Sequence, residues 1–182
     1  MKVMFASDIH GDRVCAGKML DAYKKEKAER LFLLGDLLYH GPRNDLPENY
    51  DPKGVIALLN GSKKELLCVR GNCDTEVDQM VLEFPIMAEY AYLSLDGLDM
   101  FLTHGHHFNM QKAPMLKPHG ILIHGHTHVL CVEEFGDGNL YLNPGSVTLP
   151  KGDNVRSYMV YENRVFSIKS LENGEIIKEV KI

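Results

Sequence analysis

The nine residues after Met1 read Lys2-Val3-Met4-Phe5-Ala6-Ser7-Asp8-Ile9-His10, an apolar run that stops abruptly at polar side chains. A short apolar run of this kind indicates a buried β-strand. Two later runs repeat the pattern: Leu31–Leu34 ends just before Asp36, and Glu65–Val69 ends shortly before Asn72. The sequence therefore predicts three strands, each followed by a side chain that can bind metal or phosphate.

Helical patterns separate these three strands. Asp12 can cap a helix that the charged run Lys24–Lys27 closes near its C-terminal dipole. Apolar side chains recur within it at roughly helical spacing, at Val14, Met19, Ala22 and Tyr23. A second, shorter helix is expected over Val55–Leu59, after a long loop from Tyr39 to about Pro52. The order strand, helix, strand, helix, strand is typical of a parallel sheet.

After Pro85 the pattern changes to short strands. Residues 91–95 and 98–103 flank Asp96-Gly97, a strong hairpin signal. Further strands are expected at 121–124, 129–134 and 140–143, and a meander from Ser157 to Ile182. No repeat or linker divides the chain. We therefore expect one domain over residues 1–182 with an α/β fold, in which two mixed β-sheets pack as a sandwich with flanking helices (α-β-β-α).

Composition narrows the function classes. The 182 residues are 45% hydrophobic and 25% charged, which is typical of a globular protein. A formal net charge of -5 gives no electrostatic reason to expect nucleic-acid binding. No uncharged stretch approaches the roughly 20 residues of a membrane span. The four cysteines form no Cys-x-x-Cys pair, so we expect reduced thiols and a cytoplasmic protein.

Five polar clusters each lie at the end of an apolar run. They are Asp8-Ile9-His10, Gly35-Asp36, Gly71-Asn72-Cys73-Asp74, His104-Gly105-His106 and His124-Gly125-His126-Thr127-His128. Loops at the carboxyl ends of strands meet on one rim of an α/β fold, so distant segments can converge there. Alternate positions of an extended strand end can also point to one side, which would let Asp8 and His10 bind one ion. Carboxylates, an amide and several imidazoles together suit two adjacent divalent ions.

In this order the clusters resemble the motifs Asp-x-His, Gly-Asp, Gly-Asn-His-Asp, His-Gly and Gly-His-x-His of the calcineurin-like metallophosphoesterase superfamily. The similarity is greatest to its small bacterial and archaeal phosphodiesterases and runs from Met1 to about Lys151. The stretches His40–Asn44 and Asn143–Ser146 match as well. The resemblance implies a metal-dependent phosphodiesterase that hydrolyses small or exposed phosphodiesters through a hydroxide bridging two metal ions.

The resemblance also implies a division of roles. The first metal would be held by Asp8, His10 and His128, and the second by Asn72, His104 and His126, with Asp36 bridging. The ions would be Mn²⁺ in preference to Zn²⁺, Fe²⁺, Ni²⁺ or Co²⁺. Candidate catalytic residues are Asp36, Asn72, Cys73, Asp74 and His106. Candidates for contact with the substrate are Arg43 and Cys73.

One residue departs from the family pattern. Cys73 replaces the histidine of Gly-Asn-His-Asp, which often assists the leaving group. A thiol is a poorer general acid than an imidazolium at neutral pH, and loss of general acid catalysis costs about 10²–10⁴-fold. We therefore predict a preference for better leaving groups, unless His106 or another histidine substitutes.

Several alternatives stay open from the sequence. The same metals would serve a phosphomonoesterase, and a retromer subunit of this fold acts as a non-catalytic scaffold. A nuclease is disfavoured because the chain is acidic and lacks a basic stripe. His124 fits either a ligand or a packed core histidine, and His107 fits an exposed loop. Asp74 fits either an orienting role or a cap. Exposed edge strands near the C-terminus would permit a homo-oligomer.

Overall fold

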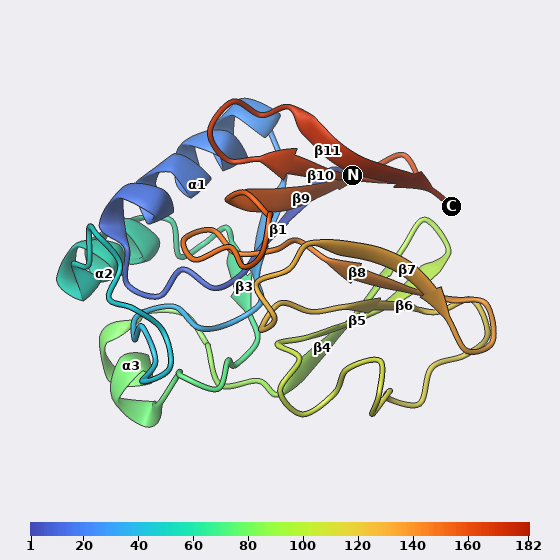
Figure 1. Ribbon diagram of the computed structural model, residues 1–182, viewed down its shortest axis with the longest axis horizontal. Helices are drawn as coiled ribbons and strands as arrows, with labels where there is room; N and C mark the ends of the chain where they lie inside the picture. Colours follow the sequence, from blue (N-terminus) through green and yellow to red (C-terminus); the bar gives the residue numbers. More distant parts are fainter.

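The computed structural model describes residues 1–182, and it contains two mixed β-sheets (Figure 1). The first sheet has the strand order β11-β10-β9-β1-β2-β3, and the second has the order β4-β5-β6-β8-β7. The first is built from β1 (Val3–Ala6), β2 (Arg30–Leu33), β3 (Leu66–Cys68), β9 (Ser157–Glu162), β10 (Val165–Ser170) and β11 (Ile176–Lys181). The second is built from β4 (Tyr90–Leu95), β5 (Leu98–Thr103), β6 (Ile121–Ile123), β7 (Cys131–Phe135) and β8 (Asn139–Asn143).

The N-terminal strands form the expected parallel unit. β1 pairs with β2, and β2 pairs with β3, both in parallel. Helix α1 (Arg13–Glu26) connects the first two strands, and α2 (Pro52–Gly61) lies between the second and third. The Asp12 side chain accepts a hydrogen bond from the Cys15 backbone nitrogen at 2.8 Å, so it caps α1 as predicted.

The C-terminal meander extends this first sheet. β9 runs antiparallel to β1, with Phe5 opposite Met159. In the second sheet β5, β6 and β8 are parallel neighbours, and β4 and β7 are antiparallel edge strands. The predicted fold of two mixed sheets is confirmed. Both sheets place several strand ends along the edge where the polar clusters lie.

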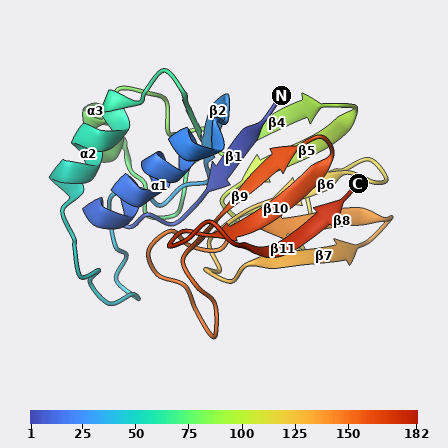
Figure 2. The ribbon, with the colours of Figure 1, turned by 90° about the horizontal axis from the view of Figure 1, so that it is seen from above.

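Two hydrophobic cores hold the layers together. One core joins the helices to the outer face of the first sheet, for example Met19 and Leu59 against Met4. The other lies between the sheets, where Phe5 belongs to the same buried cluster as Ile123. Figures 1 and 2 show the helices gathered at one side of the molecule. Burial of these side chains is the main favourable contribution to folding.

The flanking helices cover only the first sheet. The outer face of the second sheet carries Phe101, Leu122 and Tyr141, and these pack against Phe108, Met110 and Leu116 from the segment between β5 and β6. A loop therefore takes the place of a second helical layer. A third helix, α3 (Glu76–Val81), has a capping box made by Thr75 and Asp78 but no buried residue. It was not predicted, because its six residues are too few for the spacing of Val77, Met80 and Val81 to indicate a helix.

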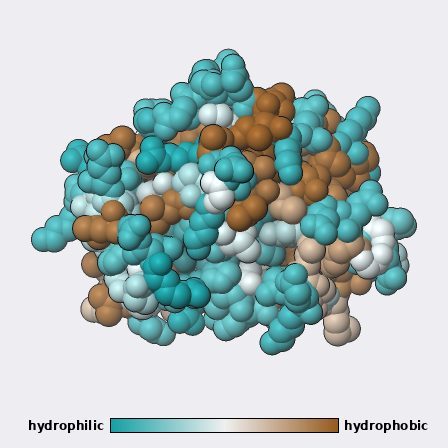
Figure 3. Space-filling view, viewed as in Figure 1, coloured by the Kyte–Doolittle hydropathy of each residue, from teal (hydrophilic) through white to brown (hydrophobic).

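The surface is mostly polar. Figure 3 shows hydrophilic residues over much of one face, interrupted by hydrophobic patches. Met80 and Val77 on α3 are among the exposed apolar side chains, with 83% and 68% of their surface accessible. None of the helices combines the length and the apolar character that crossing a bilayer requires.

Candidate metal centre

All seven predicted metal ligands lie in one cluster between the ends of the two sheets, in which Asn72 is exposed, His126 is half-buried and the others are buried. Each follows the carboxyl end of a strand. Asp8 and His10 follow β1, Asp36 follows β2, Asn72 follows β3, His104 follows β5, and His126 and His128 follow β6. The strand-end placement expected from the sequence therefore brings residues more than a hundred positions apart into contact.

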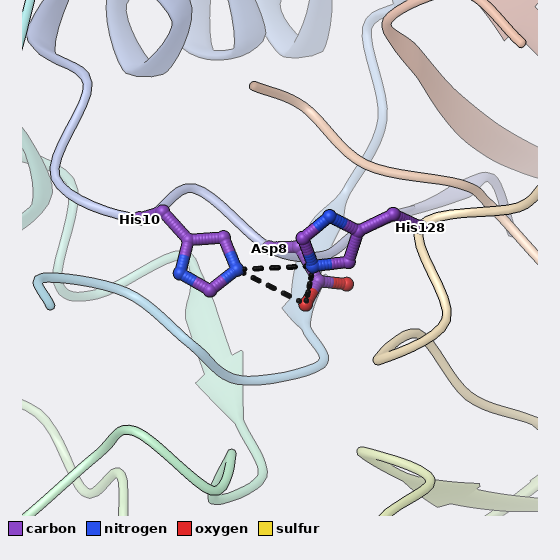
Figure 4. Close-up of side chains that lie close together, drawn as sticks. All are labelled: Asp8, His10 and His128. Carbon is purple, nitrogen blue, oxygen red and sulfur yellow. Dashed lines mark hydrogen bonds and ion pairs between the residues drawn. The ribbon is translucent and has the colours of Figure 1, made fainter. Parts of the chain in front are cut away.

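The first group consists of Asp8, His10 and His128 (Figure 4). The two Nε2 atoms of the histidines lie 3.1 Å apart, and Asp8 Oδ1 lies 3.2 Å from that of His128 and 3.5 Å from that of His10. Each Nδ1 faces a backbone carbonyl, Tyr39 O at 2.8 Å and Leu149 O at 2.6 Å. A carbonyl only accepts, so both Nδ1 atoms must donate. The facing Nε2 atoms of the neutral rings then carry bare lone pairs beside a carboxylate, which suits a shared cation.

The second group repeats this arrangement around His104. Its Nδ1 donates to Leu34 O at 2.7 Å, which leaves Nε2 free as a ligand. That Nε2 atom lies 3.1 Å from Asn72 Oδ1, 3.2 Å from His126 Nδ1 and 3.4 Å from Asp36 Oδ2. Four potential ligand atoms therefore meet at one point, and one of them is a carboxylate oxygen.

Asp36 lies between the two groups. Its Oδ2 atom is 3.4 Å from His104 Nε2 and 3.8 Å from His10 Nε2, so the carboxylate can reach both. Its Oδ1 atom accepts a hydrogen bond from the Cys73 backbone nitrogen at 2.8 Å. The position fits the bridging role that the resemblance implied, because a carboxylate can bind one ion through each oxygen or two through one.

The electrostatics of the cluster fit divalent cations. Asp8 is fully buried, and its Oδ1 atom has no hydrogen-bond partner. Burial raises the pKa of Asp8, but His10 and His128 outweigh it and hold the pKa well below its usual range. Burial lowers the pKa of His104, yet Asp36 raises it to about 9. The cluster thus favours positive charge between two buried carboxylates, and metal ions supply that charge.

The ligand residues have an unusual backbone conformation. Asp8, His10, Asp36, His126 and His128 all have positive φ, between 49° and 64°. The sequence-based idea that Asp8 and His10 lie on an extended strand end is wrong, because β1 ends at Ala6 and both residues are left-handed. Their side chains converge through tight turns instead. The Ser146 hydroxyl supports these turns by donating to Asp8 O at 2.9 Å.

Asp74 binds the backbone of the loops that carry the candidate ligands. Its carboxylate accepts hydrogen bonds from the backbone nitrogens of Gly71, Asp36 and Leu37 at 2.7, 2.8 and 2.9 Å. The residue is buried and does not line the pocket. Of the two roles left open by the sequence, the geometry agrees with orientation of the loop that carries Asp36.

A pocket of about 270 Å³ opens over the cluster. Asp36, Asn72, Cys73, His126 and His128 line its inner part. Arg43 and Lys151 line it as well, together with Gly41, Pro42, Asn44 and Thr127. Sequence reasoning included Arg43 but missed Lys151. The only signal for Lys151 was its place just beyond the last matched motif.

The remaining histidines lie around the cluster. The His106 ring centroid is 5.4 Å from that of His104, and burial and the nearby His104 lower the pKa of His106 to about 4. His106 groups with the exposed His107 and with Glu89, which His107 contacts at 2.9 Å. His124 packs on Tyr141 with centroids 4.4 Å apart and belongs to neither metal group. It is therefore a packed core histidine.

Comparison with known proteins identifies the family. A model of the calcineurin-like phosphoesterase superfamily domain matches residues 1–164. The chain belongs to this superfamily. It is accordingly an enzyme that hydrolyses phosphoesters, and the non-catalytic scaffold alternative is not supported.

The relatives include well-matched bacterial proteins. Over 182 residues the chain is 45% identical to phosphodiesterase YfcE of Escherichia coli K12, covering all of this chain and 98% of the relative. The solved structure of Yfce, a phosphoesterase from E. coli, matches with a TM-score of 0.97 over the whole of both chains. Phosphodiesterase MJ0936 of Methanocaldococcus jannaschii is 26% identical over 80% of this chain and 83% of its own length. The sandwich fold is thus shared with phosphoesterases over its full extent.

Proposed function

We propose that the protein is a phosphodiesterase that hydrolyses small or exposed phosphodiesters at a dinuclear divalent-metal centre. The observation that carries the proposal is the position of Asp36 between two ligand groups, 3.4 Å from His104 Nε2 and 3.8 Å from His10 Nε2. A single carboxylate reaching both groups supports two adjacent ions. The diester preference is supported by the phosphodiesterase name of the relative at 45% identity.

The ions, when bound, would supply a hydroxide nucleophile at neutral pH and stabilise negative charge on the phosphoryl group. The side chains of the protein would hold the ions and the substrate in position. The backbone carbonyls that accept from the Nδ1 atoms of His10, His104 and His128 would fix these three rings with their other nitrogens toward the ions. Arg43 lines the pocket and is placed to contact the substrate. The carboxylate and amide oxygens favour Mn²⁺ and the imidazoles also suit Zn²⁺, Fe²⁺ or Ni²⁺, so the ligand types support a first-row divalent ion, of which Mn²⁺ is our first choice.

The leaving group receives little acid assistance in this proposal. Burial and the neighbouring Asp36 raise the pKa of the Cys73 thiol, so the thiol is a weak proton donor at pH 7. His106 is the alternative donor, but a pKa of about 4 keeps its ring neutral at pH 7. We therefore do not assign His106 the role of general acid, and we keep the preference for good leaving groups. Four free cysteines are in keeping with a cytoplasmic location.

The test compares bis(p-nitrophenyl) phosphate with p-nitrophenyl phosphate at saturating Mn²⁺, with metal content measured on the same samples. We expect turnover of the diester to exceed that of the monoester, to vanish on chelation and to return with Mn²⁺. About two ions per chain should be bound. A higher kcat/KM for the monoester would favour the phosphomonoesterase alternative, and a single ion at full activity would contradict the dinuclear centre.

A further inference from the structure

Two cations line the pocket without a partner. Arg43 and Lys151 are both exposed, and neither forms an ion pair within 4.0 Å. Some cations elsewhere are paired, for example Arg13 with Asp51 and Lys117 with Asp99, and others such as Lys25 are not, so what distinguishes Arg43 and Lys151 is their place in the lining of the pocket. In a chain of net charge -5, two unpaired cations beside the metal cluster concentrate positive potential at the pocket.

The two cations come from opposite sheets and are held near the cluster. Arg43 lies in the loop after β2 of the first sheet, where Asn44 Nδ2 donates to His40 O at 2.8 Å. Lys151 follows β8 of the second sheet, and its backbone nitrogen donates to the carbonyl of the metal-ligand candidate His128 at 3.1 Å. The main chain of Lys151 is therefore tied to the loop that carries His128, whereas the bond beside Arg43 closes its own loop.

The rest of the pocket limits what can bind. Asp36 is the one carboxylate among the lining residues, and Pro42 and Cys73 are the two apolar side chains. The volume of about 270 Å³ lies just below the range of roughly 300–1,000 Å³ that is usual for small-molecule pockets, which suits a short arm. An apolar or aromatic arm would meet few apolar side chains there, and a cationic arm would meet like charge. A short polar arm with negative charge fits the lining.

We propose that Arg43 and Lys151 form a second anion site, which selects phosphodiesters whose non-leaving arm carries an additional anionic group such as a carboxylate or phosphate. The inference rests on the proposed phosphodiesterase function and names its substrate class. A diester phosphate has a single negative charge, and the metal ions, when bound, would already neutralise it. The two unpaired cations are then available to the arm.

The experiment uses p-nitrophenyl phosphodiesters that share a leaving group and differ in the other arm. The arms are 3-sulfopropyl (anionic), 3-(methylsulfonyl)propyl (neutral, nearly the same size) and 3-(trimethylammonio)propyl (cationic). A sulfonate is a poor metal ligand, so it probes charge rather than chelation. For the Mn²⁺-loaded wild type we expect kcat/KM to fall in the order anionic, neutral, cationic.

Variants show whether the two cations contact the arm of the ester or its phosphoryl group. Lys151→Met should lower the ratio of kcat/KM for the anionic over the neutral ester about fivefold, mainly through KM, as expected for one partly exposed ion pair. Lys151→Glu should make the cationic ester better than the anionic one. Arg43→Gln should lower the ratio similarly. Lys25→Met, at an exposed lysine of α1, is the control and should leave the order and ratio unchanged.

The outcomes distinguish the two proposals. No turnover of any diester would overturn the phosphodiesterase itself. Turnover of all three esters without an order in wild type, or with a ratio that the variants do not change, would overturn the second anion site alone. An equal loss on all three esters would place the cations on the phosphoryl oxygens and would also overturn it.

Discussion

At the level of single residues, the cluster combines common ligand types with a rare backbone conformation. A left-handed residue other than glycine costs about 1–2 kcal/mol, less for residues such as aspartate that bond locally. Asp8, His10, Asp36, His126 and His128 all adopt it. Surrounding hydrogen bonds, such as Thr148 Oγ1 to Ile9 O at 2.7 Å, hold these turns in place. Strain of this kind accumulates where function requires a fixed geometry.

Asp36→Asn should reduce turnover of the nitrophenyl diester by more than about 100-fold. Loss of a residue that only orients a metal ligand costs up to about 100-fold, and Asp36 is proposed to bind the ions directly. The amide removes the bridging charge, although its oxygen can still accept from the Cys73 nitrogen, now 2.8 Å away. The measurement is kcat at saturating Mn²⁺, together with bound metal and thermal midpoint as controls for binding and folding. A near-wild-type rate in a folded variant would contradict the proposal that Asp36 bridges two ions.

Cys73→His should raise the rate on diesters with poor leaving groups, by at least about tenfold for an alkyl leaving group. The imidazole can donate a proton that the Cys73 thiol, with its raised pKa, retains. A much smaller effect is expected for nitrophenolate, which leaves without help. The check is a plot of log kcat/KM against leaving-group pKa, whose slope should become shallower. An unchanged slope would count against the loss of acid catalysis in the native chain.

The sequence predicted the residues that the structure brings together as candidate ligands, but not every residue around them. Asp8 and His128 were recognisable because they stand at the ends of apolar runs. His106 has the same sequence setting as His104, yet only His104 points a free Nε2 atom into the cluster. Lys151 was missed because an exposed lysine has no local pattern. These differences depend on side-chain direction, which neighbouring segments determine.

At the level of elements, one buried carboxylate joins two strand-end loops. Asp74 follows β3 and binds the backbone nitrogens of Asp36 and Leu37 after β2. We expect Asp74→Asn to lower the free energy of unfolding by about 1–3 kcal/mol, because an amide cannot accept at both ends and leaves a buried N–H unpaired. Urea unfolding of the metal-free protein measures this. Asp153→Asn, at an exposed carboxylate that makes no hydrogen bond or ion pair, is the control, and an equal effect there would contradict the prediction.

Elements with a strong apolar pattern were predictable, and those without one were not. The strands near Val3–Ala6, Arg30–Leu33 and Leu66–Cys68 were found because buried runs mark them. Helix α3 was missed because its six residues are too few for apolar spacing to indicate a helix. The pairing of β9 with β1 was not readable, because it joins residues more than 150 positions apart. Such pairing is decided by packing between the sheets rather than by local sequence.

At the level of the whole molecule, Glu26 on α1 connects the helical layer to an N-terminal and a C-terminal segment of the first sheet. Its carboxylate lies 2.7 Å from Lys2 Nζ before β1 and 2.7 Å from Lys169 Nζ on β10. The Tyr158 hydroxyl on β9 donates to it at 3.0 Å. Burial raises the pKa of Glu26, but the hydrogen bonds from Lys169, Lys2 and Tyr158 outweigh it and lower the pKa to about 2. The network therefore contributes to the stability of the first sheet as a unit.

This lowered pKa predicts how stability depends on pH. The folded pKa of about 2 lies below the ordinary value of 4.5, so the contribution of Glu26 is full above about pH 5.5 and is lost as the pH falls toward 2. Glu26→Gln should therefore be destabilised by about 1.5–3 kcal/mol at pH 7, the range for hydrogen bonds to charged groups. Its difference from wild type should shrink steadily below pH 5. Urea unfolding of both proteins in chelator from pH 7 to pH 3 measures that difference directly, with Glu48→Gln at an exposed position as the control. A difference that stays constant over this range would show that Glu26 stabilises the fold by packing rather than by its charge.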